Sequence, residues 1–474
     1  MAPITARISF ALSSQKQFLT TVLIFIGTLV VFLATNANVI NEPFFNDALY
    51  TAFPSWTLVH DHSLNIRSVK LDYGYRNGFF VQLEDFRLNA KGDIVGGRVF
   101  SDRFPGSIIF AVPFYALAGL ATFSMVPANI AASVATAGAI AIMYRILLAI
   151  APRKTALAAT LLLAFATGMW TVASDTLWSE GPTLLALSLA TWALTKNSYV
   201  LAALGYGLSI FCRPHTAVIG ACSGIWLSIS QRRFKPVVFL AIGCSAGLAL
   251  LITYNFANLG RWSILTGSYA PRISSAISTS KSGGQATITN WSADYFNTLL
   301  SPLHGLFVYS PFLLVLLPGV YAGWKVAPAW VRSSAVGAVI YLIVQLAGNS
   351  WIGGDGYFGY RLVLVSLFLC VPLLVLSWQE FVSGYRWMRV AFAVLAVASL
   401  WWFALGSVTS NKFLGGVNGI GAAKSSDFQV LSAIHAHPPG AWLLAALFAG
   451  VIAWIIWPDQ ARSASRKDRA KATA

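Results

Sequence analysis

Long apolar stretches separated by short polar segments run along most of the chain. A helix needs about 20 apolar residues to cross the hydrocarbon core of a bilayer. Thirteen stretches approach this length: roughly 18–35, 107–125, 128–149, 155–173, 177–195, 199–212, 215–230, 236–256, 305–324, 330–348, 361–378, 388–405 and 440–457. The alternating segments that are typical of a transmembrane β-barrel are not seen. The pattern predicts an all-α polytopic membrane protein.

Basic segments between the stretches predict how the chain is oriented, because Lys and Arg gather on cytoplasmic loops. The basic segments are the loops at 153–154, 232–235 and 386–389 and the tail 458–474. With the N-terminus inside, they cannot all be cytoplasmic if all thirteen stretches cross the membrane. We predict that 107–125, which contains Pro113, is instead a juxtamembrane helix in the outer leaflet. About 12 transmembrane helices then remain, and both ends of the chain are cytoplasmic.

The composition agrees with a membrane protein and excludes a soluble globular one. Hydrophobic residues make up 57% of the 474 residues, charged residues only 10%, and the mean hydropathy is +0.68. A soluble domain carries about 25% charged residues. The net charge of +16 is explained by cationic loops, so we expect no nucleic-acid partner. The four cysteines have no paired spacing and are interpreted as packing residues.

Polar chemistry is expected on the outer side of the membrane. The predicted spans are nearly free of ionisable groups, which gather instead at their outer ends. Three loops on that side are long: 36–104, 257–304 and 406–438. We therefore interpret 1–457 as a single transmembrane domain with extracytoplasmic loops, followed by the basic cytoplasmic tail 458–474.

The first outer loop holds eight of the 16 acidic residues and supplies the first candidate. Asp47 lies shortly after the first span, among Phe44, Phe45, Tyr50 and Phe53. A carboxylate held against aromatic rings at a membrane surface can have a raised pKa and serve as a base. The alternative is an acid at the start of a helix in a solvated loop.

The same loop ends with an acid and a base next to a Pro-Gly turn. Asp102 and Arg103 precede the sequence FPGSIIFAVPFYAL, so the turn delivers both groups to the membrane surface. The alternative is a local ion pair, which contributes about 0–1 kcal/mol when it is exposed.

Two short outer turns carry further candidates. SDTLWSEGP holds Asp175 and Glu180, and an acid near a helix N-terminus is stabilised by the helix dipole whether or not it has a function. Glu180 ranks higher, since it lies within an apolar run where a carboxylate needs a partner. The turn GGDGYFGYR holds Asp355 and Arg361. Arg361 could bind a phosphate or pair with Asp355 or Glu180. His304, at the mouth of another span, could donate to a phosphate or be an ordinary interfacial histidine.

Taken together, these motifs resemble the GT-C superfamily of membrane glycosyltransferases. Its members include protein O-mannosyltransferases, lipid A aminoarabinose transferase and mycobacterial arabinofuranosyltransferases. The resemblance covers the chain to about residue 380 and rests on NDALY with Asp47, DRFPGSIIFAVPFYAL, SDTLWSEGP, a long outer loop after the seventh span, and GGDGYFGYR. The sequence reads FPG where many members read PPG.

This resemblance implies a GT-C-like fold and an inverting enzyme. Such enzymes move a single sugar from a polyprenyl-phosphate carrier to an acceptor hydroxyl on a lipid, glycan or protein, on the extracytoplasmic side of the cytoplasmic membrane. Asp47 would be the base that takes the acceptor's proton, with Asp102 beside it at the catalytic centre.

The resemblance also implies which residues bind the substrates. Arg103, His304 and Arg361 would hold the departing phosphate. Asp102, Asp175 and Glu180 would bind sugar hydroxyls or orient those cations, and Asp355 belongs to the same substrate-binding group. Some relatives place a divalent metal ion between outer carboxylates. Here Asp47 and Asp175 would share it, but the sequence leaves its presence open.

Two other functions remain as alternatives. An O-antigen ligase or polymerase that uses a lipid-pyrophosphate donor tends to have its functional loop late in the chain, with paired arginines, whereas here the acid-rich loop comes first. A lipid or sugar transporter would have polar residues at the membrane midplane or inverted repeats, and the sequence shows neither.

Overall fold

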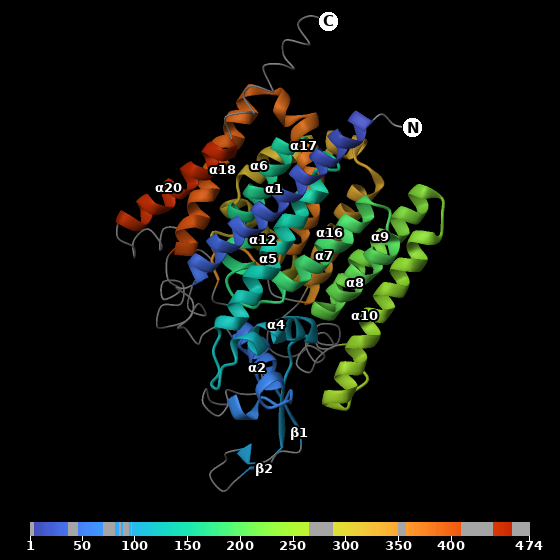
Figure 1. The fold of residues 1–474 in the computed structure, drawn as a ribbon, viewed down its shortest axis with the longest axis vertical. Coiled ribbons are helices and arrows are strands. Elements are labelled where there is room, and N and C mark those ends of the chain that lie inside the picture. Colours follow the sequence, from blue (N-terminus) through green and yellow to red (C-terminus); the bar gives the residue numbers. More distant parts are fainter. Residues whose placement is uncertain are drawn as a thin grey trace, which may run out of the picture.

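The fold is described from a computed structural model. The described residues are 4–36, 46–69, 81–84, 87–88, 94–95, 97–264, 288–348, 357–408 and 439–456. Within them, helices occupy the positions of all twelve predicted spans (Figure 1). Nine of these positions hold one main helix each: α1 Ile4–Asn36, α5 Val126–Leu147, α7 Glu180–Thr195, α8 Tyr199–Cys212, α10 Lys235–Leu259, α16 Ala329–Gly348, α17 Leu364–Glu380, α18 Arg386–Val408 and α20 Pro439–Ile456.

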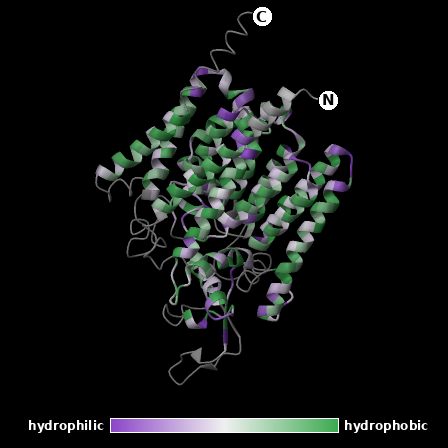
Figure 2. Cartoon of the chain, viewed as in Figure 1, coloured by the Kyte–Doolittle hydropathy of each residue, from purple (hydrophilic) through white to green (hydrophobic). Residues whose placement is uncertain are grey.

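The apolar character of this bundle confirms the prediction of an all-α polytopic membrane protein. Seven helices in the described part of the chain are long and apolar enough to cross a membrane: α1, α5, α10, α16, α17, α18 and α20. Hydrophobic residues dominate the bundle, and hydrophilic ones collect toward its two ends (Figure 2). The remaining segments are shorter or interrupted.

Three predicted spans are interrupted or carry an extra turn. The span predicted at 155–173 consists of α6 Arg153–Phe165 and the π-helix η1 Met169–Ala173, and the span predicted at 215–230 consists of the 3₁₀ turn η2 Pro214–Thr216 and α9 Ala217–Gln231. The span predicted at 305–324 is divided into α13 Leu306–Tyr309, α14 Phe312–Leu316, η3 Leu317–Gly319 and α15 Val320–Val326. Proline interrupts helices because it lacks an N–H donor, and Pro311 and Pro318 lie at the last set of breaks. Ser310 compensates by donating a hydrogen bond to the Ala166 carbonyl at the α6–η1 break, 2.8 Å away.

The stretch predicted to lie in the outer leaflet forms α4 Pro105–Ala118, at the same end of the bundle as α2 Asn46–His60 (Figure 1). With 14 residues, α4 is too short to cross a bilayer. It is also shorter than the predicted 107–125, because Gly119 takes a left-handed conformation with φ of 58° and ends the helix. Leu117 is 88% exposed, which suits a helix that contacts lipid.

The basic loops lie at the other end. The N-terminal end of α1 and the α9–α10 and α17–α18 junctions are at the end of the bundle opposite α2 and α4 (Figure 1). This arrangement is the one that the positive-inside pattern requires. Which side of the membrane each end faces stays a prediction.

The described part of the first long loop contains four short strands, which were not predicted from the sequence. β1 Val81–Glu84 pairs antiparallel with β4 Arg98–Ser101, and β2 Arg87–Leu88 pairs with β3 Ile94–Val95. The end of β4 is fixed to α2, since the Ser101 hydroxyl donates to the Tyr50 carbonyl at 2.6 Å. β4 therefore leads directly into Asp102 and Arg103.

The Pro-Gly turn that begins α4 allows a close helix crossing. A Cβ atom at Gly106 would lie 2.6 Å from the backbone nitrogen of Cys212 and 2.7 Å from the carbonyl carbon of Phe211, at the end of α8. Only glycine fits this approach, which holds the Arg103 segment against the Arg213 segment.

We expect Gly106→Val to separate α4 from α8 and to destabilise the protein by about 1–3 kcal/mol, the usual cost of overpacking. Gly27→Ala in α1 is the matched control, because a Cβ atom there has nothing within 4 Å. Thermal unfolding of both variants in detergent measures the effect. An unchanged midpoint for Gly106→Val would contradict the close packing described here.

Candidate active site

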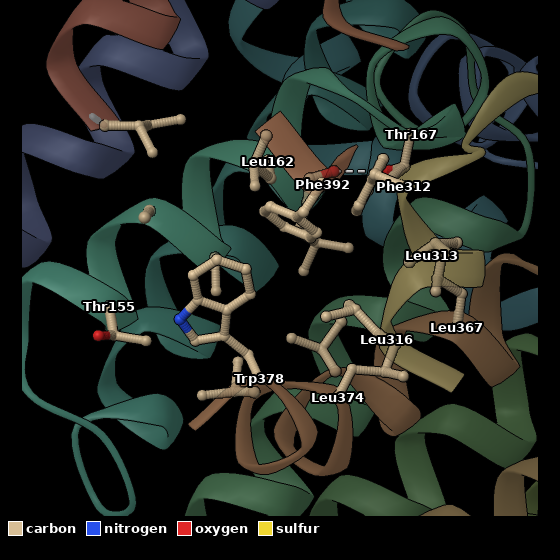
Figure 3. A pocket seen from close by; sticks show the side chains of 16 residues that line it. Thr155, Leu162, Thr167, Phe312, Leu313, Leu316, Leu367, Leu374, Trp378 and Phe392 are labelled. Carbon is tan, nitrogen blue, oxygen red and sulfur yellow. Dashed lines mark hydrogen bonds between the residues drawn. The ribbon is translucent and has the colours of Figure 1, made fainter. Parts of the chain in front are cut away.

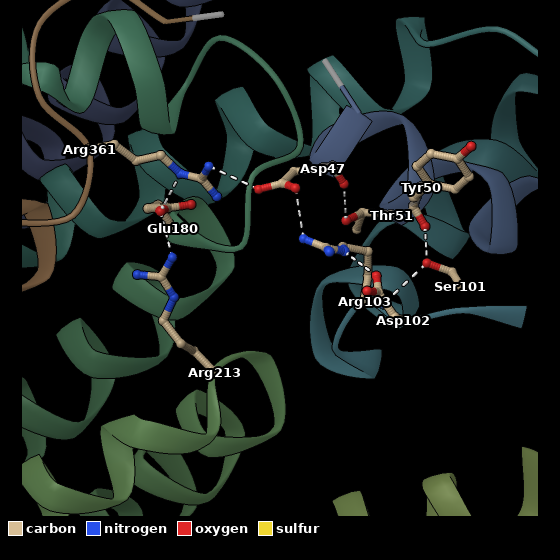
Figure 4. A network of polar contacts seen from close by, with 9 residues as sticks. All are labelled: Asp47, Tyr50, Thr51, Ser101, Asp102, Arg103, Glu180, Arg213 and Arg361. Atoms are coloured by element: carbon tan, nitrogen blue, oxygen red, sulfur yellow. Dashed lines mark hydrogen bonds and ion pairs between the residues drawn. The ribbon is translucent and has the colours of Figure 1, made fainter. Parts of the chain in front are cut away.

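Six charged side chains meet between the end of the bundle and the α2–α4 cap (Figure 4). They come from five separate segments: α2, the β4–α4 turn, the start of α7, the α8–η2 junction and the turn before α17. The six are Asp47, Asp102, Arg103, Glu180, Arg213 and Arg361. Three negative and three positive groups therefore form one connected network.

Asp47 is held by two arginines at once. Arg103 Nη1 donates to its Oδ1 at 2.8 Å, and Arg361 Nη1 donates to its Oδ2 at 3.0 Å. Its side chain is 23% exposed, the largest exposure in the network. Burial by itself raises the pKa of Asp47, but the charges of Arg103 and Arg361 outweigh burial and lower the pKa below its usual value. This direction is opposite to the one expected from the aromatic surroundings alone.

Glu180 forms the deep end of the network. Its side chain is fully buried, and its Oε1 accepts hydrogen bonds from Arg213 Nη2 at 2.6 Å and from Arg361 Nε at 2.7 Å. Its Oε2 accepts no hydrogen bond from any described residue. Glu180 begins α7, where the helix dipole adds to the stabilisation of its charge. Of the partners proposed for Arg361 from the sequence, the structure thus shows Glu180.

Asp102 orients Arg103. Its carboxylate is fully buried and accepts a hydrogen bond from Arg103 Nε at 2.7 Å. This is not the exposed ion pair that was the alternative interpretation of the sequence. Since Asp102 occupies Nε and Asp47 contacts Nη1, the guanidinium is held on two sides.

The Arg361 guanidinium stacks on an aromatic ring, and the turn that carries Arg361 is held by further contacts. Its guanidinium carbon is 3.9 Å from the ring centroid of Trp178. Two residues earlier, Gly359 has φ of 85°, a conformation that favours glycine. Its carbonyl accepts a hydrogen bond from His304 Nδ1, and the His304 ring stacks on Tyr357 with centroids 4.5 Å apart.

Burial lowers the pKa of His304 to about 4, so the ring is neutral at pH 7. With the proton on Nδ1, its Nε2 carries none to donate. We therefore expect His304 to support the turn that carries Arg361.

The structure brings together five of the eight predicted site residues: Asp47, Asp102, Arg103, Glu180 and Arg361. His304 lies behind the Arg361 turn. Asp175 lies half-buried in the turn between η1 and α7. Asp355 lies outside the described residues.

Arg213 and the residues around it were not among the site residues expected from the sequence. Arg213 Nη1 donates to the Tyr341 hydroxyl at 3.0 Å, and His215 stacks on Tyr341 with centroids 5.0 Å apart. The sequence does contain one indication that Arg213 is unusual, because it is a lone base in a two-residue turn between two apolar stretches. This indication does not reveal its partner Glu180, which is 33 residues away in the sequence.

The network does not have the composition of a metal site. No group of three His, Cys, Asp or Glu side chains among the described residues could hold a metal ion. Both oxygens of Asp47 contact guanidinium groups, whose charges repel a cation. The residues present therefore do not fit a divalent ion shared by Asp47 and Asp175.

An apolar cavity lies elsewhere in the bundle, between α6, α14, α17, α18 and α20 (Figure 3). Its lining includes Leu162, Phe312, Leu374, Trp378 and Phe392, and contains no acid or base. It shares no residue with the charged network, and it offers no group for proton transfer.

Comparison with solved structures finds chains with a similar fold. The structure of ArnT from Cupriavidus metallidurans in the apo state matches with a TM-score of 0.50 and 11% sequence identity, over 92% of this chain and 77% of that one. The fold is GT-C-like. No family model and no curated protein sequence matches the chain.

We expect Glu180→Gln to destabilise the protein by about 3–5 kcal/mol, because it leaves the buried Arg213 and Arg361 without their shared countercharge. Glu380→Gln, an exposed acid at the end of α17, is the matched control. Thermal unfolding in detergent measures both. Equal midpoints for the two variants would show that the buried pairs do not stabilise the fold.

The charge of Asp47 should stabilise the protein in a pH-dependent way. Because its pKa is lower in the folded state, this contribution is complete above the unfolded pKa, near 4, and is lost as the pH falls through the folded pKa. The difference in thermal midpoint between wild type and Asp47→Asn should therefore be largest above about pH 5 and shrink as the pH falls toward the lowered folded pKa. A difference independent of pH would contradict the ion pairs.

Proposed function

We propose that the protein is an inverting glycosyltransferase of GT-C type. It moves a single sugar from a polyprenyl-phosphate carrier to an acceptor hydroxyl on a lipid, glycan or protein, on the extracytoplasmic side of the membrane. The observation that carries this proposal is the position of Asp47: the most exposed carboxylate of the network, in direct contact with two nearly buried arginines.

This juxtaposition suits transfer from a phosphate leaving group. The base takes the proton of the acceptor hydroxyl as its oxygen attacks the anomeric carbon, and the bond from that carbon to the phosphate oxygen breaks. The arginines stabilise the negative charge that develops on the phosphate, which is most effective in a site that excludes water. Asp47 is our candidate for the base, and Arg103 and Arg361 are our candidates for the phosphate site.

The surroundings support a lipid-linked donor. The network lies beside α4, whose surface residues Ile109 and Leu117 are apolar and exposed. A polyprenyl tail would find such a surface at the membrane while its phosphate reached the arginines. The GT-C-like fold shared with ArnT agrees with this proposal. Of the acids assigned to the sugar or to the arginines, Asp102 and Glu180 orient the arginines, and Asp175 remains our candidate contact to the sugar hydroxyls.

Transfer of sugar from a labelled polyprenyl-phosphate donor in membranes tests the proposal. Wild type should consume the donor, and Asp47→Asn should lose at least about 100-fold in rate, the lower range for removal of a general base. Asp61→Asn is the matched control: this acid is also in the α2 region but pairs with His60 and Ser68 away from the network.

Each other outcome has a distinct meaning. Equal consumption by wild type and Asp47→Asn would exclude Asp47 as the base and direct attention to Asp102, Asp175 or Glu180. Transfer only from lipid-pyrophosphate donors would favour a ligase or polymerase. Movement of intact lipid or sugar across the membrane, without transfer, would favour a transporter.

A further inference from the structure

We propose that Asp47 occupies the anion site of the ligand-free protein and that the donor's phosphate displaces it, so that phosphate binding itself frees the base. This inference rests on the proposed function and adds to it an order of events. It concerns the exchange of one anion for another on Arg103 Nη1 and Arg361 Nη1.

The first support is that both carboxylate oxygens of Asp47 are engaged by the two arginines. Each of its carboxylate oxygens accepts a hydrogen bond from a different guanidinium group. A carboxylate in this state has little tendency to accept a proton, and its lowered pKa has the same cause. Asp47 must leave at least one arginine before it can serve well as a base.

The second support is that the arginines are held in place independently of Asp47. Asp102 accepts a hydrogen bond from Arg103 Nε at 2.7 Å, and Glu180 accepts one from Arg361 Nε at 2.7 Å. Both of these acids are fully buried. The two Nη1 groups therefore keep their positions when Asp47 turns away, and they form a preorganised pair of donors for an incoming anion.

The third support is the balance of charge and exposure. Among the described residues, the three acids of the network balance its three arginines in charge, so an added phosphate binds best where it replaces one of the acids. Asp47 is the exposed acid of the three, at 23%, and is the one that can move into water at low cost. The donor's phosphate is a diester with one negative charge, so it replaces Asp47 on the two arginines charge for charge. The second negative charge appears only when the sugar leaves and a phosphate monoester forms.

The exchange has a consequence for the reaction. Without donor, the base is tied to the arginines and does not activate water. With donor bound, the phosphate takes the two Nη1 groups, and Asp47 is free to accept the proton of the acceptor hydroxyl. The bond from the anomeric carbon to the acceptor oxygen then forms as the bond to the phosphate oxygen breaks, and the electron pair of that bond stays on the phosphate.

Binding of a short-chain isoprenyl phosphate that carries no sugar tests this exchange. Titration calorimetry of the purified full-length protein in detergent gives the affinity. Asp47→Asn should bind the isoprenyl phosphate about tenfold or more tightly than wild type, because the competing carboxylate is gone. Asp61→Asn should bind like wild type. Asp47→Ala repeats the test should the Asn variant fail to fold.

Further titrations show whether the site recognises the phosphate anion, the lipid chain or both. The isoprenyl alcohol of the same length should bind Asp47→Asn and wild type equally, since it has no anion. Inorganic phosphate should show the same preference for Asp47→Asn if the site recognises the anion alone, and no binding if the lipid is also needed. Arg103→Gln introduced into Asp47→Asn should abolish the gain.

The exchange would be overturned by equal or weaker binding of the isoprenyl phosphate to Asp47→Asn. If wild type still transferred sugar in that case, the proposed function would stand and only the exchange would fall. If neither protein bound the isoprenyl phosphate, the phosphate site and the exchange would be wrong, and the transfer assay alone would decide whether the proposed function stands.

Discussion

A buried carboxylate shared by two arginines is the interaction on which the rest of the site depends. Glu180 is fully buried and contacts Arg213 and Arg361, which lie 33 and 181 residues away in the sequence. Removing one partner from such a set leaves an uncompensated charge, which costs several kcal/mol. The start of α7, the end of α8 and the turn before α17 are therefore fixed relative to one another. The network is as much a constraint on packing as a candidate centre for chemistry.

The interruptions in the helices of the bundle support the turn before α17, which carries Arg361. The Phe358 carbonyl accepts a hydrogen bond from Thr171 in η1 at 2.7 Å, and the Gly359 carbonyl accepts one from His304. Ser310, at the interruption before α14, contacts both the Ala166 carbonyl and the Tyr360 hydroxyl. Broken helices are tolerated in a membrane protein only where protein groups satisfy the freed backbone. Here the breaks supply the side chains that hold the segment of Arg361 in place.

Exposure decreases in steps from Asp47 through Arg103 and Arg361 to Glu180. At the buried end, one oxygen of Glu180 is shared by two arginines, whereas Asp47 is partly exposed and, in the exchange that we propose, changes partners. In the part of the chain that the structure describes, the network is charge-neutral and its most exposed acid is Asp47, which suits a substrate that is itself an anion. The α4 helix places this exposed end beside an apolar surface, where a lipid-linked anion would arrive in the proposed function.

The sequence by itself determined the membrane character, the position of every span in the described bundle, and five residues of the network. Apolar stretches must be buried in lipid or protein, and isolated charges at their ends must find partners, so both can be inferred locally. It could not determine which charges pair. The pKa direction of Asp47, the role of Arg213 and the strands before Asp102 depend on segments brought together from distant parts of the chain. Electrostatic interactions act through space, and only the tertiary structure decided that Asp47 faces two arginines.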